Sequence, residues 1–366
     1  MANHAFSKFI RPDNAPGGPI TARDLDIIDA VLRYRFISAA QLGRLVGGNE
    51  DVTHRRLRRL WERGLINRWA FPGIRSHSEF YYYLDNRESL TLLAERRGWE
   101  FDDQMLEEIK GHREKDYAAA ALRGQHMQLG FLQHSLVISR MHFMIEMACR
   151  KSAGKVVLET WVQGGQLAGR KAAVPRVKSD RQGGETFWRE TNETERLPVE
   201  PDALFTLRFP NRPQGQQLAH FFYEADRGTM NSTDMMKKLR AYYHFIKKQQ
   251  AHRQAFGIHP IRAVLTETTN EARAKKLMEL VNHPLVCGPD KRAGLFWFTI
   301  STLFTGDGTE PPQQALPLPK LHPYLDHPEI ILQPIWALPD RTRHALGDVE
   351  NSSARSALTV RNILNT

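Results

Sequence analysis

The stretch DVTHRRLRRLWER, residues 51–63, decides how the first hundred residues are interpreted. On an α-helix each residue turns the chain by about 100°, so side chains three and four positions apart share a face. One face of this stretch carries Thr53, Leu57, Leu60 and Trp61, and the other carries Arg55, Arg56, Arg59 and Arg63. The spacing predicts a helix that packs its apolar face on its own domain and exposes a row of guanidinium groups.

Arginine dominates this helix and the segment that follows it. Residues 53–75 hold seven arginines and a single acid, Glu62. A planar guanidinium can form two parallel hydrogen bonds with a phosphate or with the edge of guanine. An arginine face of this kind is therefore typical of a helix that enters the major groove of DNA. We interpret residues 51–63 as a recognition helix.

The neighbouring segments complete a small domain around this helix. The polar residues Thr21 and Ser38 are suited to cap two earlier helices. After Gly64, residues 65–70 and 79–84 are predicted to form two strands joined by a turn. Three helices followed by a two-stranded ribbon is the order of a winged helix-turn-helix domain. We predict such a domain over residues 21–100, behind a flexible arm at residues 1–20.

Double-stranded DNA is the partner predicted for this domain. The residues expected to contact it are Arg55, Arg56, Arg59 and Arg63 on the helix, with Arg68 and Arg75 on the ribbon or at its tip. The alternative is a winged helix that binds protein, on which the basic helix is only a solvated surface. The confinement of the basic residues to one face favours DNA. Winged helices often bind two half-sites as dimers, so a homodimer is left open, as are contacts with replication or mobilisation proteins.

Composition places the chain among soluble globular proteins. Of its 366 residues 41% are hydrophobic and 25% are charged, and the formal net charge of +10 favours an anionic partner. No stretch approaches the roughly 18 apolar residues of a membrane-spanning helix, and the first residues lack the apolar run of a secretory signal. We expect a cytoplasmic protein, associated with the nucleoid or a plasmid and without a membrane partner. Cys149 and Cys287 lack zinc-ligand spacing and are expected to be buried thiols.

The rest of the chain divides by composition and hydrophobic pattern. Residues 101–130 are polar and charged and are predicted to be a helical connector. Residues 131–305 alternate strands with helices, which predicts an α/β domain with a central mixed sheet. Within it, the polar and glycine-rich residues 163–198 are predicted to be a flexible insertion. Residues 306–366 are predicted to be a proline-rich linker and tail, and the chain as a whole to be an α+β protein.

Acidic residues stand at the ends of two predicted strands in this second domain. Pro201-Asp202 opens one strand, and Glu224 with Asp226 closes the next. The pattern resembles the Pro-Asp…(Asp/Glu)-x-Lys core of restriction-endonuclease-like nucleases. In that core two carboxylates on adjacent strands hold Mg²⁺, and a lysine orients or activates the attacking water. Because side chains alternate along a strand, Glu224 and Asp226 share a face and could converge with Asp202.

The lysine of the nuclease pattern is missing from its usual position, which holds Asp226 here. A lysine from the following helix would have to replace it. Along that helix runs an apolar stripe formed by Met235, Leu239, Tyr242 and Ile246. Lys238 lies at the edge of the stripe and Lys237 points nearly opposite, so Lys238 is the better candidate, unless both are ordinary surface charges. The expected site comprises Asp202 and Glu224 as Mg²⁺ ligands, with Asp226 and Lys238 as further catalytic residues.

Several stretches between residues 20 and 300 match one known family. They are residues 21–24, 55–60, 64–66, 82–84, His134, 201–203, 223–229, 238–239 and Tyr242. The most specific is Glu224-x-Asp226-Arg227-Gly228-Thr229. In these residues the chain resembles the replication-relaxation family of proteins carried by plasmids and mobile elements. The resemblance implies a bacterial DNA-binding protein that acts in plasmid replication or DNA relaxation.

Three hypotheses for the function follow from these patterns. In the first, the winged helix binds a duplex site and the second domain nicks DNA with Mg²⁺, or is a degenerate form of such a nuclease. In the second, the protein is a non-enzymatic regulator or replication accessory factor, and its nuclease-like fold serves dimerisation or partner docking. In the third, the winged helix binds protein. The three differ in whether DNA is bound and whether it is cut.

Overall fold

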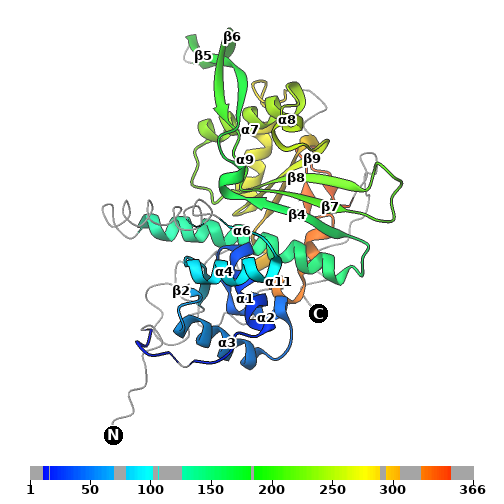
Figure 1. The fold of residues 1–366 in the computed structure, drawn as a ribbon. Helices are drawn as coiled ribbons and strands as arrows, with labels where there is room; N and C mark the ends of the chain where they lie inside the picture. Colours follow the sequence, from blue (N-terminus) through cyan, green and yellow to red (C-terminus); the bar gives the residue numbers. More distant parts are fainter. Residues whose placement is uncertain are drawn as a thin grey trace. The chain divides into compact units, whose positions relative to one another are not determined.

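The computed structural model describes residues 11–15, 17–69, 80–101, 106, 126–182, 185–288, 294–305 and 323–347. The chain forms two compact units, each with its own sheet (Figure 1). Unit 1 comprises residues 1–143 and 310–321, and unit 2 comprises residues 144–309 and 322–366. The division between the units falls after residue 143, inside the long helix α6 (His126–Lys151). From the sequence alone, the second domain is instead predicted to begin at residue 131.

Unit 1 begins with three short helices whose starts follow local capping rules. The three helices are α1 (Ala22–Tyr34), α2 (Ala39–Val46) and α3 (Glu50–Glu62). Their N-cap residues are Thr21, Ser38 and Asn49, respectively. Each capping side chain accepts a hydrogen bond from a backbone N–H of the first turn, which has no partner within the helix. In α1 and α2 the third helical residue also bonds back to the cap, which closes a capping box.

A small antiparallel sheet accompanies these helices. Its strands lie in the order β1 (Ile37–Ser38), β3 (Tyr81–Tyr83) and β2 (Asn67–Trp69). Helix α4 (Arg87–Arg97) follows β3. The three helices and the two later strands match the order predicted for residues 21–84, whereas the two-residue strand β1 is too short to produce a periodic pattern. Residues 70–79, which include the predicted turn and Arg75, lie outside the described residues.

Unit 2 is built on a seven-stranded sheet in the order β12-β11-β10-β9-β8-β7-β4. Its strands are β4 (Val157–Gln163), β7 (Ala203–Arg208), β8 (Leu218–Ala225), β9 (Ile261–Thr268), β10 (Phe296–Ile300), β11 (Trp336–Ala337) and β12 (Arg343–His344). Strands β8, β9 and β10 pair in parallel, and every other pair is antiparallel. The sheet is therefore mixed, as the alternation of strands and helices predicts.

Two helices of unit 2, α7 (Ser232–Tyr243) and α9 (Glu271–Val281), pack on one face of this sheet. Leu239 of α7 and Leu277 of α9 lie in one buried cluster with Phe222 and Val264 of the strands. Helix α7 continues into a π-helical turn, η2 (His244–Lys248), before the short helix α8 (His252–Phe256). The apolar stripe of α7 thus holds this helix over strands β7 and β8. The remaining short helices are η1 (Gly164–Leu167), α10 (Thr302–Thr305), α11 (Pro323–Asp326) and η5 (Pro328–Leu332).

The segment 163–198, predicted to be a flexible insertion, is instead mostly a long β-hairpin. Strands β5 (Lys171–Gln182) and β6 (Glu185–Pro198) pair antiparallel and project from the body of unit 2 (Figure 1). Ala172, Val174 and Leu197 anchor the base of the hairpin in the buried cluster. The prediction is wrong because, beyond its buried base, the projecting ribbon exposes both faces, so most of its sequence is polar like that of a loop and lacks the apolar alternation of a half-buried strand.

The prediction of a linker and tail over residues 306–366 is also too broad. Residues 323–347 add α11, η5 and the edge strands β11 and β12 to unit 2, and Ile331 and Trp336 are fully buried. The rest of that segment lies outside the described residues, as does most of the predicted connector at 101–130. The two cysteines are buried thiols, as expected, and burial raises the pKa of Cys149 to about 12. In the part of the chain that the structure describes, no helix is long and apolar enough to cross a membrane.

Candidate functional site

Two acidic residues face each other across strands β7 and β8 of unit 2. Asp202 directly precedes β7, and Glu224 lies near the end of β8. Ala203 pairs with Tyr223 in the antiparallel register, so the preceding residue Asp202 lies opposite Glu224. The backbone N–H of Asp202 donates to the carbonyl of Tyr223 (3.0 Å), and its Oδ2 accepts from the N–H of Ala225 (2.8 Å). The strand pairing itself therefore brings the two carboxylates together.

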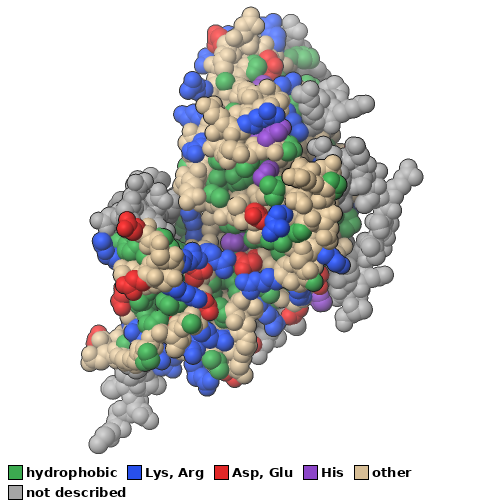
Figure 2. All heavy atoms as spheres, turned by 45° about the vertical axis from the view of Figure 1, so that its right-hand side comes forward, with side chains coloured by type: hydrophobic (Ala, Val, Ile, Leu, Met, Phe, Trp, Pro, Cys, Tyr) green, Lys and Arg blue, Asp and Glu red, His purple; other side chains and the backbone are tan. Residues whose placement is uncertain are grey.

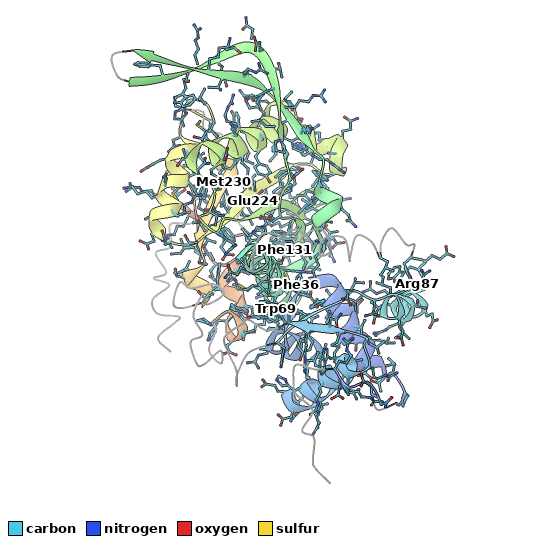
Figure 3. All side chains as sticks on the ribbon, turned by 90° about the vertical axis from the view of Figure 1, so that its left-hand side faces the viewer. Phe36, Trp69, Arg87, Phe131, Glu224 and Met230 are labelled. Carbon is cyan, nitrogen blue, oxygen red and sulfur yellow. The ribbon has the colours of Figure 1, made fainter. Side chains whose placement is uncertain are left out.

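Helix α7 adds a lysine and a tyrosine to this pair. Lys238 and Tyr242 are one helical turn apart, so both side chains extend from the same face of α7. The Lys238 ammonium forms an ion pair with Oε2 of Glu224, and the Tyr242 hydroxyl donates a hydrogen bond to Oε1. Glu224 lies in the interior of unit 2 (Figure 3), and its side chain is only 9% exposed. Each carboxylate oxygen of Glu224 thus has a partner on α7.

Burial controls the ionisation of this cluster. It raises the pKa of Glu224 to about 7, because the cost of desolvation and the nearby Asp202 outweigh the stabilising Lys238 and Tyr242. Burial alone would lower the pKa of Lys238, but the charges of Glu224 and Asp202 outweigh it, and the pKa is raised. Burial and Glu224 together raise the pKa of Tyr242 well above its usual value. At neutral pH the lysine is therefore charged, the tyrosine is a neutral donor, and Glu224 is close to its titration point.

Asp226, the third acid predicted for the site, is held by other residues. Arg273 of α9 binds both of its carboxylate oxygens, at 2.8 and 3.1 Å, and the Thr268 hydroxyl donates to one of them at 2.7 Å. The residue ties the end of β8 to β9 and α9. Within the described residues, no group of three or more His, Cys, Asp or Glu side chains is arranged to hold a metal ion. The structure therefore brings together Asp202, Glu224 and Lys238 but commits Asp226 to Arg273.

Sequence reasoning missed Tyr242 as part of the site. The residue counts toward the apolar stripe of α7, and it is indeed almost fully buried. The spacing in the sequence could have identified Tyr242, because it lies four residues after Lys238 and two polar groups one helical turn apart can reach the same acceptor. Lys237, by contrast, is half exposed and lies 3.9 Å from Asp234 on the outer side of α7. The contrast between Lys237 and Lys238 follows the predicted helix geometry.

The arginine-rich helix of unit 1 is α3. Its buried residues are Thr53, Leu57, Leu60 and Trp61, which confirms the predicted inner face. Arg55 is exposed, and Arg58 is paired with Glu62 on the same helix (2.7 Å). Arg59 and Arg63 donate to the backbone carbonyls of Gly17 and Gly18, at 3.3 and 2.8 Å. These carbonyls carry no net charge, and among the described residues no acid forms an ion pair with Arg59 or Arg63.

The other two described DNA contacts predicted for this unit, Arg56 and Arg68, pack against an acid and against aromatic rings of unit 1. Arg56 forms an ion pair with the buried Asp24 (2.9 Å) and donates to the Thr21 hydroxyl (2.9 Å). Burial would raise the pKa of Asp24, but hydrogen bonds from Thr21 and Arg56 lower it. The guanidinium of Arg68 lies between two aromatic rings, 3.4 Å from the centroid of Trp61 and 4.2 Å from that of Phe80. Arg56 and Arg68 thus hold α3 and the sheet in place.

Two features define the class of protein. A small helical unit with an arginine-rich helix is joined to a mixed-sheet α+β unit in which a partly buried lysine forms an ion pair with one of two opposed carboxylates. A model of the replication-relaxation family matches residues 29–260, more than half of the chain, and the match includes α3, Asp202, Glu224 and Lys238. The chain therefore belongs to the replication-relaxation family. No curated protein and no solved structure matches it.

Proposed function

We propose that this protein binds duplex DNA through helix α3 and nicks it at a Mg²⁺-dependent site formed by Asp202, Glu224 and Lys238. The observation that carries the proposal is the convergence of the two carboxylates on adjacent strands with a lysine from α7. This is the set of groups that the restriction-endonuclease-like pattern calls for, with the lysine supplied by the helix and not by position 226. Nicking would relax a supercoiled plasmid, in keeping with membership of the replication-relaxation family.

The donor set is suited to Mg²⁺. This ion takes oxygen ligands and is commonly held by one or two carboxylates together with water and substrate phosphate. Asp202 raises the pKa of Glu224, so the two acids are close enough to repel each other, and a cation between them would relieve that repulsion. When bound by Asp202 and Glu224, the ion would supply Lewis-acid stabilisation of the phosphate and a water of lowered pKa.

The protein groups around the acids have separate tasks in this proposal. The N–H of Ala225 fixes Asp202, and the Tyr242 hydroxyl fixes Glu224. Lys238, charged at neutral pH, stabilises the negative charge that develops on the attacked phosphate. Because Lys238 pairs with Glu224 before substrate arrives, its ammonium is already positioned, and little reorganisation is needed at the moment of reaction.

Unit 1 supports the DNA-binding part of the proposal. Its three helices and small sheet have the order of a winged helix-turn-helix domain, and α3 occupies the place of the recognition helix. Arg55, Arg59 and Arg63 form no ion pair with an acid in the part of the chain that the structure describes, and their positive charge suits contacts with phosphate. Lys and Arg side chains are also spread over the face drawn in Figure 2, in line with the formal charge of +10.

A plasmid assay tests the cutting activity. Purified protein is incubated with supercoiled plasmid and MgCl₂, and we expect relaxed circles that are absent with Asp202→Ala or Glu224→Ala. Asp234→Ala, at an exposed acid on α7, is the matched control and should nick like the wild type. A protein that binds the plasmid but yields no product with Mg²⁺ or Mn²⁺ would refute the nicking proposal.

The burial of Glu224 favours a second candidate function. Both of its oxygens already have protein partners, and the side chain is almost closed to solvent. A cluster of this kind can serve as a structural ion pair in a nuclease-like fold that has no activity. The protein would then be a non-enzymatic DNA-binding regulator or replication accessory factor, and the same plasmid assay would show binding without cutting.

A further inference from the structure

The described part of the N-terminal arm, residues 11–15 and 17–20, lies alongside helix α3 (Figure 1). The backbone carbonyls of Gly17 and Gly18 accept hydrogen bonds from Arg59 (3.3 Å) and Arg63 (2.8 Å) of this helix. The chain then enters α1 at its N-cap residue, Thr21. The arm therefore covers part of the arginine face that is proposed to contact DNA.

A second set of contacts holds the other end of the arm. Arg11 donates to the backbone carbonyl of Ile66 (3.3 Å) and to the side-chain oxygen of Asn67. Its guanidinium also lies 5.8 Å from the centroid of the Trp61 ring. These partners lie at the C-terminal end of α3 and at the start of β2. The arm is thus attached to unit 1 at two points, one near each end of its described part.

Gly18 is suited to the point where the arm meets α3. Its φ of +134° is a backbone conformation that residues with a side chain rarely adopt. A Cβ atom at this position would also overlap the guanidinium of Arg59. At Gly17, by contrast, a Cβ atom would meet no other atom within 4 Å. A methyl group at residue 18, but not at residue 17, should therefore loosen the arm.

The arm widens the element that a DNA groove would have to admit. An α-helix with its side chains is about 10–12 Å across, and the major groove of B-DNA is about 12 Å wide. A helix therefore fills the groove by itself, and a chain segment packed beside it adds about 5 Å. Helix α3 together with the arm is too wide for the groove.

The arm and DNA also compete for the same groups. Arg59 and Arg63 are two of the arginines proposed to contact phosphate, and both donate to the arm. A phosphate carries a full negative charge, whereas the arm offers neutral carbonyls, and hydrogen bonds between two charged groups are the stronger kind. DNA can therefore displace the arm, at the cost of breaking its contacts.

We propose that the N-terminal arm is an autoinhibitory segment, and that α3 enters the major groove only after the arm has left it. The inference rests on the proposed function, because α3 is the helix assigned to duplex binding. Only molecules with a released arm are competent to bind, so the apparent affinity for DNA is lowered in proportion to their fraction. Changes that release the arm should raise the affinity.

The two glycines provide the test and its matched control. Fluorescence anisotropy measures the affinity for a labelled DNA duplex at fixed salt, with EDTA present to prevent cutting. Gly18→Ala should raise the affinity about 5-fold, because the strained backbone favours the released arm. Gly17→Ala adds the same methyl group in open space and should bind like the wild type. Circular dichroism checks that each variant is folded.

Arg11→Ala tests the other end of the arm by the sign of its effect. Removing a cation that contacts phosphate would lower the affinity and would reduce the slope of log affinity against log salt by about 1. Removing a residue that only holds the arm on unit 1 should instead raise the affinity and leave the slope unchanged. We expect the second result.

The outcomes separate this inference from the proposed function. If the wild type, Gly17→Ala and Gly18→Ala bind the duplex equally well, the autoinhibitory role is overturned and the proposed DNA binding stands. If Gly18→Ala binds and the wild type does not, both are supported. If neither binds, the proposed function is refuted and the inference with it. A lower affinity of Arg11→Ala would make the arm part of the DNA interface, which also overturns the inference.

Discussion

The buried carboxyl of Glu224 makes the stability of unit 2 depend on pH. Its pKa is raised from 4.5, the ordinary value, to about 7 in the folded protein. A group whose folded-state pKa is raised holds its proton more tightly in the folded chain, so the contribution to stability is complete below pH 4.5 and is lost as the pH rises through 7. The shift corresponds to a fall of about 3 kcal/mol in the free energy of unfolding across this window.

The substitution Glu224→Gln isolates this effect. Glutamine keeps an acceptor for the Tyr242 hydroxyl and does not titrate, so the fall of about 3 kcal/mol should disappear. Urea denaturation at pH 4.5 to 8 measures the free energy of unfolding, and hydrogen exchange of strands β7 and β8 identifies the transition that belongs to unit 2. Titrating groups outside the cluster of Asp202, Glu224, Lys238 and Tyr242 are common to both proteins and keep their surroundings, so their contributions cancel in the difference. If the wild type and Glu224→Gln give parallel curves over this range, the reasoning about burial is refuted.

Three further predictions concern the arginines of α3 and the lysines of α7. Arg56→Ala should lower the free energy of unfolding of unit 1 by about 1–3 kcal/mol, because it leaves the buried Asp24 without its ion pair, whereas Arg55→Ala should change it by less than about 0.5 kcal/mol; thermal unfolding compares the two, and equal effects would contradict the roles given to them. Arg55→Ala/Arg63→Ala should weaken duplex binding and reduce the slope of log affinity against log salt by about 2, as measured by anisotropy titrations at several salt concentrations; an unchanged slope would exclude phosphate contacts. In the plasmid assay Lys238→Met should slow nicking by about 100-fold or more, and Lys237→Met should have almost no effect; equal rates for these two variants would remove Lys238 from the mechanism.

Local patterns predict the inner face of α3 and the orientation of α7. The buried residues of α3 follow from helical spacing alone, and so does the difference between Lys237 and Lys238. Both results depend on a single period and on caps within a few residues. The strands that carry Asp202 and Glu224 are likewise visible in the sequence as apolar runs bounded by acids.

Long-range pairing explains what the sequence could not show. Nothing near Arg56 in the sequence indicates that Asp24, 32 positions earlier, takes up its charge. In the same way nothing near Asp226 in the sequence indicates that Arg273 of a later helix binds its carboxylate. Asp202 lies opposite Glu224 only in one register of β7 against β8. The length of the loop between these strands does not specify that register. Such partners are fixed only when the whole unit is packed.

Helix α7 contacts two separate parts of unit 2 from different sides. Lys238 and Tyr242 hold Glu224 on the sheet, while Arg240 holds the base of the hairpin. A shift of α7 along its axis, or a residue inserted between Lys238 and Arg240, would disturb both connections at once, because one residue turns a helix by about 100°. The acid pair and the projecting ribbon therefore depend on the same helix. To build the Asp202–Glu224–Lys238 cluster into another protein, the sheet, helix α7 and the ribbon would have to be transferred together.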